Sequence, residues 1–234
     1  MVHIFPHGPR SRLLLVVLAA IALACGQPET PDTARAAEPA PAKAASRSDG
    51  ESFRIVFLGD SLSAGYGLPE SQAFPFLVEE RLRQQGHAVD VLNAGVSGDT
   101  TAGGLSRLDW VLRSEPQLLV IELGGNDALR GQPLENTERN LREIVRRGRA
   151  AGARVLLLGM DVPTNYGPDY AEGFAELYGR ISEEEDVPVV PGFIREVALD
   201  PSLMMADGLH PTAEGHRKLA DSLTEAIAPL VQLQ

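Results

Sequence analysis

The chain has 234 residues, of which 44% are hydrophobic and 23% charged, enough for one soluble domain with an extension. It carries 21 Lys and Arg against 32 Asp and Glu, a formal net charge of −11 at pH 7. This acidic balance disfavours nucleic acids and anionic membrane surfaces as partners, and a single cysteine excludes an internal disulfide.

Residues 1–25 have the pattern of a secretory signal peptide. Arg10 and Arg12 precede an unbroken apolar run, Leu13 to Ala24, which is shorter than the roughly 20 residues needed to span a bilayer. Cys25 follows in a sequence similar to the bacterial lipobox, where cleavage precedes a Cys that becomes lipidated. The alternative is ordinary cleavage nearby, with Cys25 lost or left as a free thiol. We expect an exported protein, located in the periplasm or on the outer membrane as a lipoprotein, or else secreted.

Residues 26–50 are rich in Ala, Pro and Ser and have no periodic apolar face, so they are predicted to be a disordered tether. Gly26 stands after the Cys where Asp would signal retention in the inner membrane. The tether leads to one domain, predicted over residues 51–234.

The domain begins with an apolar run, Phe53 to Gly59, which is predicted to be a strand that leads into a helix at Asp60-Ser61. Ligands of open α/β sheets bind beyond the carboxyl ends of the strands, where helix N-termini present free N–H groups. Ser61 is therefore well placed to be a nucleophile. The simpler alternative is that Asp60 and Ser61 only cap the helix.

Strand and helix patterns then alternate along the rest of the chain. The segment Leu118 to Ile121 is the most apolar of the strand candidates and is predicted to be central in the sheet. This alternation predicts a five-stranded parallel sheet with helices on both faces. The predicted strands are 53–59, 88–92, 117–122, 154–158 and 188–190, and the predicted helices are 73–85, 101–113, 135–151, 170–184 and 212–231.

Right-handed crossovers bring the loops after all five strands to one edge of the sheet. Acyl transfer needs donors for an oxyanion, and this edge offers the backbone N–H groups of Ser61 and Gly98 and the side-chain amide of Asn126. As alternatives, Gly98 serves only as a turn residue and Asn126 only as an Asx turn or cap.

The turn Asp207-Gly208-Leu209-His210-Pro211 lies between the fifth strand and the last helix. His is the usual general base for a serine hydroxyl, and a carboxylate on its other ring nitrogen fixes the tautomer. Asp207 and His210 are candidates for these two roles. The alternative is a solvated loop.

Together these motifs resemble the GDSL or SGNH hydrolase superfamily, in its bacterial branch of arylesterases, thioesterases and lysophospholipases. The resemblance spans residues 53–231 and rests on Gly59-Asp60-Ser61-Leu62, Gly98, Gly124-Gly125-Asn126-Asp127 and Asp207-Gly208-Leu209-His210-Pro211. It implies a flavodoxin-like three-layer α/β/α sandwich. It also implies Ser61 as nucleophile, Ser61, Gly98 and Asn126 as oxyanion donors, and Asp207 and His210 as the other triad members.

The substrate is expected to be a small acyl ester, since apolar residues in the strand-end loops suggest an acyl groove rather than an aromatic sugar platform. The candidate lining residues are Leu68, Met160, Pro163 and Tyr166. Carbohydrate O-deacetylation is the alternative reaction, and a catalytically silent binding module is the alternative class. The presence of both Ser61 and His210 disfavours the silent module.

No metal or other cofactor is predicted, because His87 and His216 have no Cys or His cluster around them and are expected at the surface. Trp110 is predicted to pack in the core or line its rim. Asp99, Thr100 and Asp127 are expected to be caps. We expect a monomer.

Overall fold

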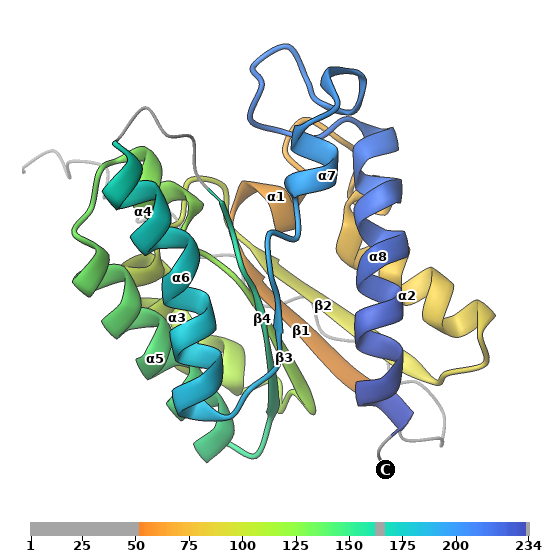
Figure 1. Ribbon diagram of the computed structural model, residues 1–234. Helices are drawn as coiled ribbons and strands as arrows, with labels where there is room; N and C mark the ends of the chain where they lie inside the picture. Colours follow the sequence, from red (N-terminus) through yellow and green to blue (C-terminus); the bar gives the residue numbers. More distant parts are fainter. Residues whose placement is uncertain (1–51, 162–166, 233–234) are drawn as a thin grey trace, which may run out of the picture. The chain divides into compact units, whose positions relative to one another are not determined.

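The computed structural model describes residues 52–161 and 167–232, which form one five-stranded parallel sheet between two layers of helices (Figure 1). The order across the sheet, β2-β1-β3-β4-β5, confirms the predicted parallel sheet and the central place of β3. The strands are β1 (Phe53–Gly59), β2 (Val89–Gly95), β3 (Leu118–Glu122), β4 (Arg154–Leu158) and β5 (Val189–Val190). The predicted signal peptide and tether lie outside the described residues.

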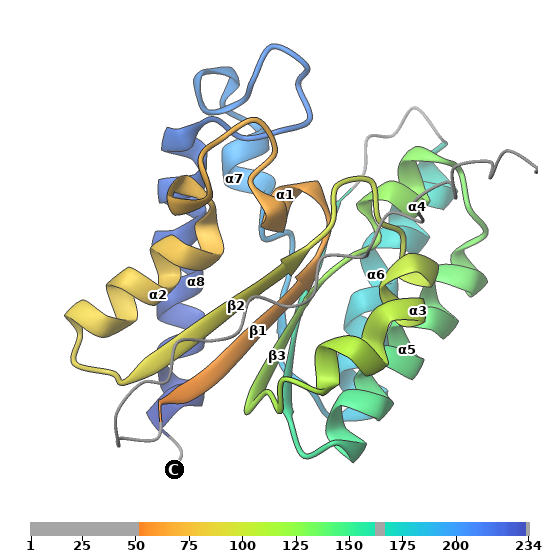
Figure 2. The ribbon, with the colours of Figure 1, turned by 180° about the vertical axis from the view of Figure 1, so that it is seen from behind.

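Five long helices cover the sheet, as Figures 1 and 2 show from opposite sides. One face carries α3 (Thr101–Leu112), α5 (Leu134–Ala150) and α6 (Pro168–Glu185), and the other carries α2 (Phe74–Gln84) and α8 (Ala213–Gln232). All five match predicted helices. The strand order is the flavodoxin-like one, in which the crevice for a ligand opens between the ends of β1 and β3.

The helix predicted to start at Asp60-Ser61 is present as the short α1 (Ser61–Ala64), whereas the sequence patterns missed two short helices at the strand ends, α4 (Gly125–Leu129) and α7 (Arg195–Ala198). Each is too short to show a helical period in its apolar residues. Strand β2 was also predicted too short. It continues to Gly95 because its last residues pair with β1, where Gly95 lies opposite Gly59.

The core lies on both faces of β1 and β3. Ile55, Val56, Phe57 and Leu58 are fully buried, as is nearly all of β3, in keeping with a sheet covered on both sides. The expectation for Trp110 was wrong, since it is 40% exposed. Helix α3 turns a different stripe inward, formed by Thr101, Gly104, Leu108 and Val111.

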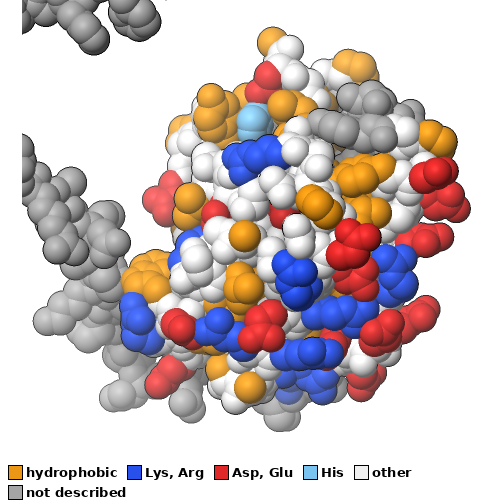
Figure 3. Space-filling model, turned by 90° about the vertical axis from the view of Figure 1, so that its left-hand side faces the viewer, with side chains coloured by type: hydrophobic (Ala, Val, Ile, Leu, Met, Phe, Trp, Pro, Cys, Tyr) orange, Lys and Arg blue, Asp and Glu red, His pale blue; other side chains and the backbone are white. Residues whose placement is uncertain are grey.

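The outer face of α5 and α6 carries interspersed basic and acidic side chains, visible on the flank in Figure 3. Arg142 contacts Glu138 and Glu184 at 2.6 Å each, and Arg146 contacts Glu185 at 2.8 Å. In each of these pairs at least one side chain is largely buried, at 16% exposed for Arg142 and 11% for Glu185. None of the helices in the described part of the chain is long and apolar enough to cross a membrane.

His216 was expected at the surface, but the structure contradicts this. It lies in α8 with 1% of its surface exposed, and its ring stacks on Phe74 at a centroid distance of 5.9 Å. The Phe74 backbone N–H donates to His216 Nδ1 at 3.2 Å, so a side chain from α8 caps the first N–H of α2. Pairing between two distant helices leaves no local signal in the sequence.

We predict that His216 makes the fold sensitive to acid. Burial, and more weakly the nearby His210, lower the pKa of His216 to about 4 from the 6.5 of a free histidine. The fold therefore favours the neutral ring, whose contribution is complete above pH 6.5 and is lost as the pH falls toward 4. The difference amounts to about 3 kcal/mol.

Urea denaturation over this pH range would measure the effect. His216→Asn keeps an acceptor near the position of Nδ1 but does not titrate, so its stability should fall less steeply with acid than that of the wild type. Equal slopes for the two proteins would contradict the assignment. A lower but parallel stability curve would reflect only the lost ring stacking.

Candidate active site

Ser61 begins α1, directly after β1 ends at Gly59, with Asp60 as the N-cap residue. The Asp60 carboxylate accepts the Leu62 N–H at 3.0 Å, so Asp60 is indeed a cap. Ser61, one residue on, faces the cavity beyond the strand ends. The two interpretations of this corner are therefore compatible, because Asp60 caps the helix and Ser61 is left as the candidate nucleophile.

A chain of hydrogen bonds joins Ser61, His210 and Asp207. The Ser61 hydroxyl lies 2.9 Å from His210 Nε2, and His210 Nδ1 lies 2.6 Å from Asp207 Oδ2. With Nδ1 donating to the carboxylate, Nε2 is left free to accept the serine proton. The structure thus brings together the three residues predicted to act as nucleophile, base and orienting acid.

Asp207 is held in its charged form. Its Oδ1 accepts the backbone N–H groups of Leu209 and His210 at 2.9 and 3.0 Å. The hydrogen bond from the His210 ring, followed by these two backbone bonds, lowers the pKa of Asp207 to about 2. A carboxylate that stays ionised can fix the ring and stabilise a positive imidazolium.

Tyr66 was not among the site residues predicted from the sequence, but it packs against His210. Its ring lies 4.4 Å from the His210 ring, centroid to centroid, at an interplanar angle of 30°. It lies just after α1, where its N–H donates to the Ser61 carbonyl, and its position in the sequence does not predict a contact with His210. The contact limits the positions available to the His210 ring.

The three predicted oxyanion donors line the same cavity as Ser61. Within the described part of the chain, the N–H groups of Ser61 and Gly98 have no hydrogen-bond acceptor. Gly98 has φ of 82°, a conformation that favours glycine, and its carbonyl accepts Arg130 at 2.8 Å. Both N–H groups are therefore available to a ligand.

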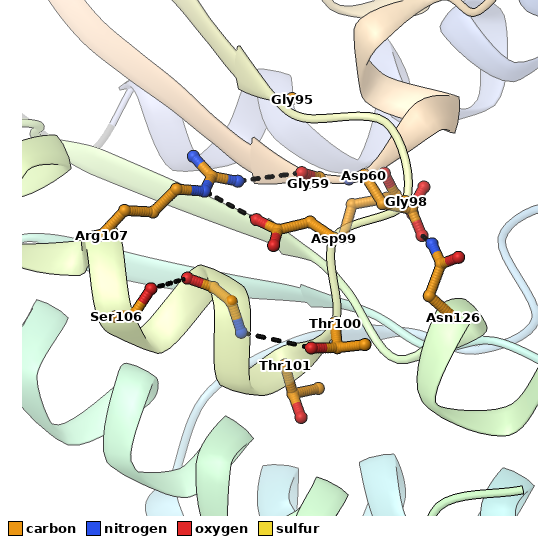
Figure 4. Close-up of polar contacts among 12 residues, drawn as sticks. Gly59, Asp60, Gly95, Gly98, Asp99, Thr100, Thr101, Ser106, Arg107 and Asn126 are labelled. Carbon is orange, nitrogen blue, oxygen red and sulfur yellow. Dashed lines mark hydrogen bonds and ion pairs between the residues drawn. The ribbon is translucent and has the colours of Figure 1, made fainter. Parts of the chain in front are cut away.

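Asn126 Nδ2 donates to Asp60 Oδ2 at 2.9 Å, as Figure 4 shows. An ionised carboxylate accepts only, so it selects the amide orientation with Nδ2 on its side. The second Nδ2 hydrogen is then free for the cavity. Burial raises the pKa of Asp60 to about 6, opposed by hydrogen bonds from Leu62 and Asn126.

The loop that carries Gly98 is fixed to the end of β1. Arg107 donates from Nε to Asp99 at 2.7 Å and from Nη2 to the carbonyl of Gly59 at 3.0 Å (Figure 4). Thr100 caps α3 by accepting the Gly103 N–H, as expected. Asp127 lies in α4 but also caps α3, since its carboxylate accepts the Thr101 N–H at 2.8 Å.

The cavity next to Ser61 has a volume of about 500 Å³. Of the predicted substrate-binding residues, Met160 lines it, Leu68 does not, and Pro163 and Tyr166 lie outside the described residues. Most of the apolar wall comes from residues that the sequence analysis did not single out. Together with Met160 it is formed by Leu129, Ile194, Ala198, Met204 and Leu209.

Residues 57–218 match the GDSL-like Lipase/Acylhydrolase family. The chain belongs to this family. It is 43% identical over 178 residues to Esterase TesA of Pseudomonas aeruginosa, covering 76% of this chain and 89% of that protein. It is 41% identical over 178 residues to Thioesterase 1/protease 1/lysophospholipase L1 of Escherichia coli, covering 76% of this chain and 84% of that protein.

The fold agrees with this assignment. A crystal structure of TesA superposes with a TM-score of 0.73 at 43% identity, covering 76% of this chain and 99% of that one. The predicted resemblance to the GDSL or SGNH hydrolases and the predicted fold class are both confirmed. As a member of this family with these relatives, the protein is a serine ester hydrolase.

We predict that Gly59→Ala destabilises the corner. A Cβ at this position would lie 2.6 Å from Glu122 Oε2 and closer still to Ser63 Oγ. Overpacking of this kind costs about 1–3 kcal/mol, and shifting Ser63 would also move α1 and lower the rate of ester hydrolysis.

Gly179→Ala is the matched control, since this glycine lies within α6 and a Cβ there meets nothing within 4 Å. It should stabilise the protein by roughly 0.5–1 kcal/mol because alanine favours helix. Urea denaturation and initial rates measure both effects. A Gly59→Ala variant as stable and as active as the wild type would show that the corner is not tightly packed.

Proposed function

We propose that the protein hydrolyses acyl esters through an acyl-enzyme on Ser61, with His210 as the base and Asp207 orienting it. The hydrogen-bond chain from Ser61 through His210 to Asp207 carries this proposal, with its distances of 2.9 and 2.6 Å. It opens onto a cavity with a largely apolar wall.

In this mechanism Ser61 Oγ attacks the ester carbonyl while His210 Nε2 takes its proton. The carbonyl oxygen becomes an oxyanion, bound by the N–H groups of Ser61 and Gly98 and the free Nδ2 hydrogen of Asn126. The imidazolium then protonates the leaving alcohol, thiol or phenol. Water attacks the acyl-enzyme by the same route, releases the carboxylic acid and restores Ser61.

The substrate proposed is an ester or thioester with an aliphatic acyl chain, a group that includes aryl esters and lysophospholipids. The wall of Leu129, Met160, Ile194 and Met204 favours an alkyl chain. Among the described residues that line the cavity, Tyr66 is the only Phe, Tyr or Trp, and it stacks on His210. Nothing in the site specifically favours a carbohydrate.

Ser61→Ala should lower kcat by at least about 10³-fold, the loss expected for a triad nucleophile. Initial rates on a soluble p-nitrophenyl ester measure this. Ser106→Ala is a matched control, because this exposed hydroxyl bonds only the Gly103 carbonyl of its own helix. A Ser61→Ala variant with near wild-type kcat would eliminate Ser61 as the nucleophile.

The same assay tests the substrate class. Rates on p-nitrophenyl esters of increasing chain length, measured beside acetylated xylan, should show hydrolysis of the alkyl esters and little release of acetate from the polysaccharide. The reverse pattern would support the O-deacetylase reading and overturn the substrate proposal, while Ser61 would remain the nucleophile in either case.

We also propose that the enzyme is exported and anchored by lipid on Cys25. The basis is the sequence alone: Arg10 and Arg12, the apolar run of residues 13–24, and the Cys that follows it. A tether of 25 residues, 26–50, would reach roughly 25–30 Å as a random coil. The active site could then work beside a membrane surface without insertion of the domain.

Cys25→Ser should release the protein from the membrane fraction and abolish labelling by palmitate analogues, with the rate on soluble esters unchanged. Fractionation of cells that express either form, with blotting for the protein, provides the measurement. Wild-type protein found entirely in the soluble periplasm or in the medium would exclude the anchor and leave the hydrolase mechanism unaffected.

A further inference from the structure

Glu122 is a buried acid that lies beneath the nucleophile and that the mechanism above does not use. It is the last residue of β3, has no exposed surface, and pairs in register with Gly59 of β1. The register places its side chain under the turn from Gly59 to Ser63. An acidic residue with no basic partner is unusual in such a place.

One oxygen of Glu122 holds the first turn of α1. Its Oε2 accepts the backbone N–H groups of Asp60 and Ser63 at 3.1 Å each and the Ser63 hydroxyl at 2.7 Å. The start of a helix presents N–H groups that need acceptors from outside the helix. Glu122 provides the acceptor for two of them, from the side of the sheet.

This arrangement accounts for the free N–H group of Ser61. The Asp60 carboxylate accepts the N–H of Leu62, and Glu122 accepts the N–H groups of Asp60 and Ser63. Within the described part of the chain, Ser61 is the residue at the start of α1 whose N–H has no acceptor, and it lines the cavity. Glu122 and Asp60 together thus direct the unsatisfied donor toward the substrate.

The other oxygen of Glu122 indicates its protonation state. Oε1 is buried and receives no hydrogen bond from the described residues, so a negative charge on it would be left without a donor. Burial and the neighbouring Asp60 carboxylate raise the pKa of Glu122 well above its ordinary value. Because Oε2 already accepts three donors, the proton belongs on Oε1. Two adjacent ionised carboxylates in a dry site would be strongly unfavourable.

We propose that Glu122 is a positioning residue that works as a neutral carboxylic acid: it fixes Asp60 and Ser63 through Oε2, and so aims the Ser61 N–H and hydroxyl, without adding a negative charge beneath the oxyanion. This inference rests on the proposed role of Ser61. An ionised Glu122 would make the same hydrogen bonds but would oppose the charge that develops in the transition state.

The test compares Glu122→Gln with Glu122→Leu. Gln keeps an acceptor oxygen and a donor in place of the Oε1 proton, whereas Leu leaves two N–H groups and a hydroxyl unsatisfied. On a soluble p-nitrophenyl ester, E122L should lower kcat on the order of 10²-fold, as expected for a misplaced nucleophile, with little change in KM. E122Q should recover most of that loss.

Infrared spectroscopy at neutral pH gives a readout that does not depend on activity or on E122L folding. The wild type should show the carbonyl stretch of a buried, protonated carboxyl group that is absent from E122Q. Glu185→Gln is the matched control, since hydrogen bonds from Arg146 lower the pKa of this acid, which is also largely buried, with 9% of its surface exposed. Its removal should take away no such band.

Two outcomes would overturn the proposal: a spectrum in which E122Q loses no protonated-carboxyl band, or a kcat for E122Q as low as that of E122L. The first would show that Glu122 is ionised, and the second that its charge is required. Neither would affect the assignment of Ser61, which depends on the separate loss of activity in Ser61→Ala.

Discussion

The active site depends on how the N–H groups at the start of α1 are satisfied. A helix that begins in a buried corner must find acceptors for these groups, and yet an oxyanion hole needs one of them left open. Here the two demands are met by different residues, because Glu122 and Asp60 accept the N–H groups around Ser61, and no residue in the described ranges accepts the N–H of Ser61 itself. The parallel pairing of β1 with β3 makes this arrangement possible, since it sets Glu122 beside Gly59. The absence of a side chain at Gly59 lets the carboxyl group approach the backbone.

The other two proposed oxyanion donors, Gly98 and Asn126, are each held in place by contacts with this corner rather than by contacts with each other. Arg107 connects the Gly98 loop to the Gly59 carbonyl, and Asp60 orients the amide of Asn126. Asp127, next to Asn126, caps α3 and so ties the loop after β3 to the loop after β2. Donors fixed in this way need little reorganisation when charge develops, which is the main source of their effect on the rate.

The sequence predicted the parts of this site that have a local signature. The strands and long helices show clear periods, and Ser61, Asp207 and His210 occupy recognisable turns beside them. What it could not predict are contacts between distant segments. His216 caps a helix more than 140 residues away, and Trp110 lies on the outer face of α3 because four other residues form its inner stripe. In the sequence, Glu122 stands at the end of an apolar run, which predicts a strand but no role for the acid. An acidic residue at the end of a buried strand is nevertheless unusual, and that is the signal by which it could have been found.

Three carboxyl groups surround the nucleophile, and their environments give them different charges. Asp207 lies in a solvated turn with three hydrogen bonds and has a pKa of about 2, so it is ionised at neutral pH. Asp60 is buried and has a pKa of about 6, and burial together with the nearby Asp60 also raises the pKa of Glu122 well above its ordinary value. The negative charge of Asp207, which would stabilise the imidazolium, thus lies on the solvent side of His210. Beneath the proposed oxyanion, burial raises the pKa of both Asp60 and Glu122 and so disfavours negative charge there. Acidification would therefore reach Asp60, and with it the orientation of Asn126, well before it reaches Asp207.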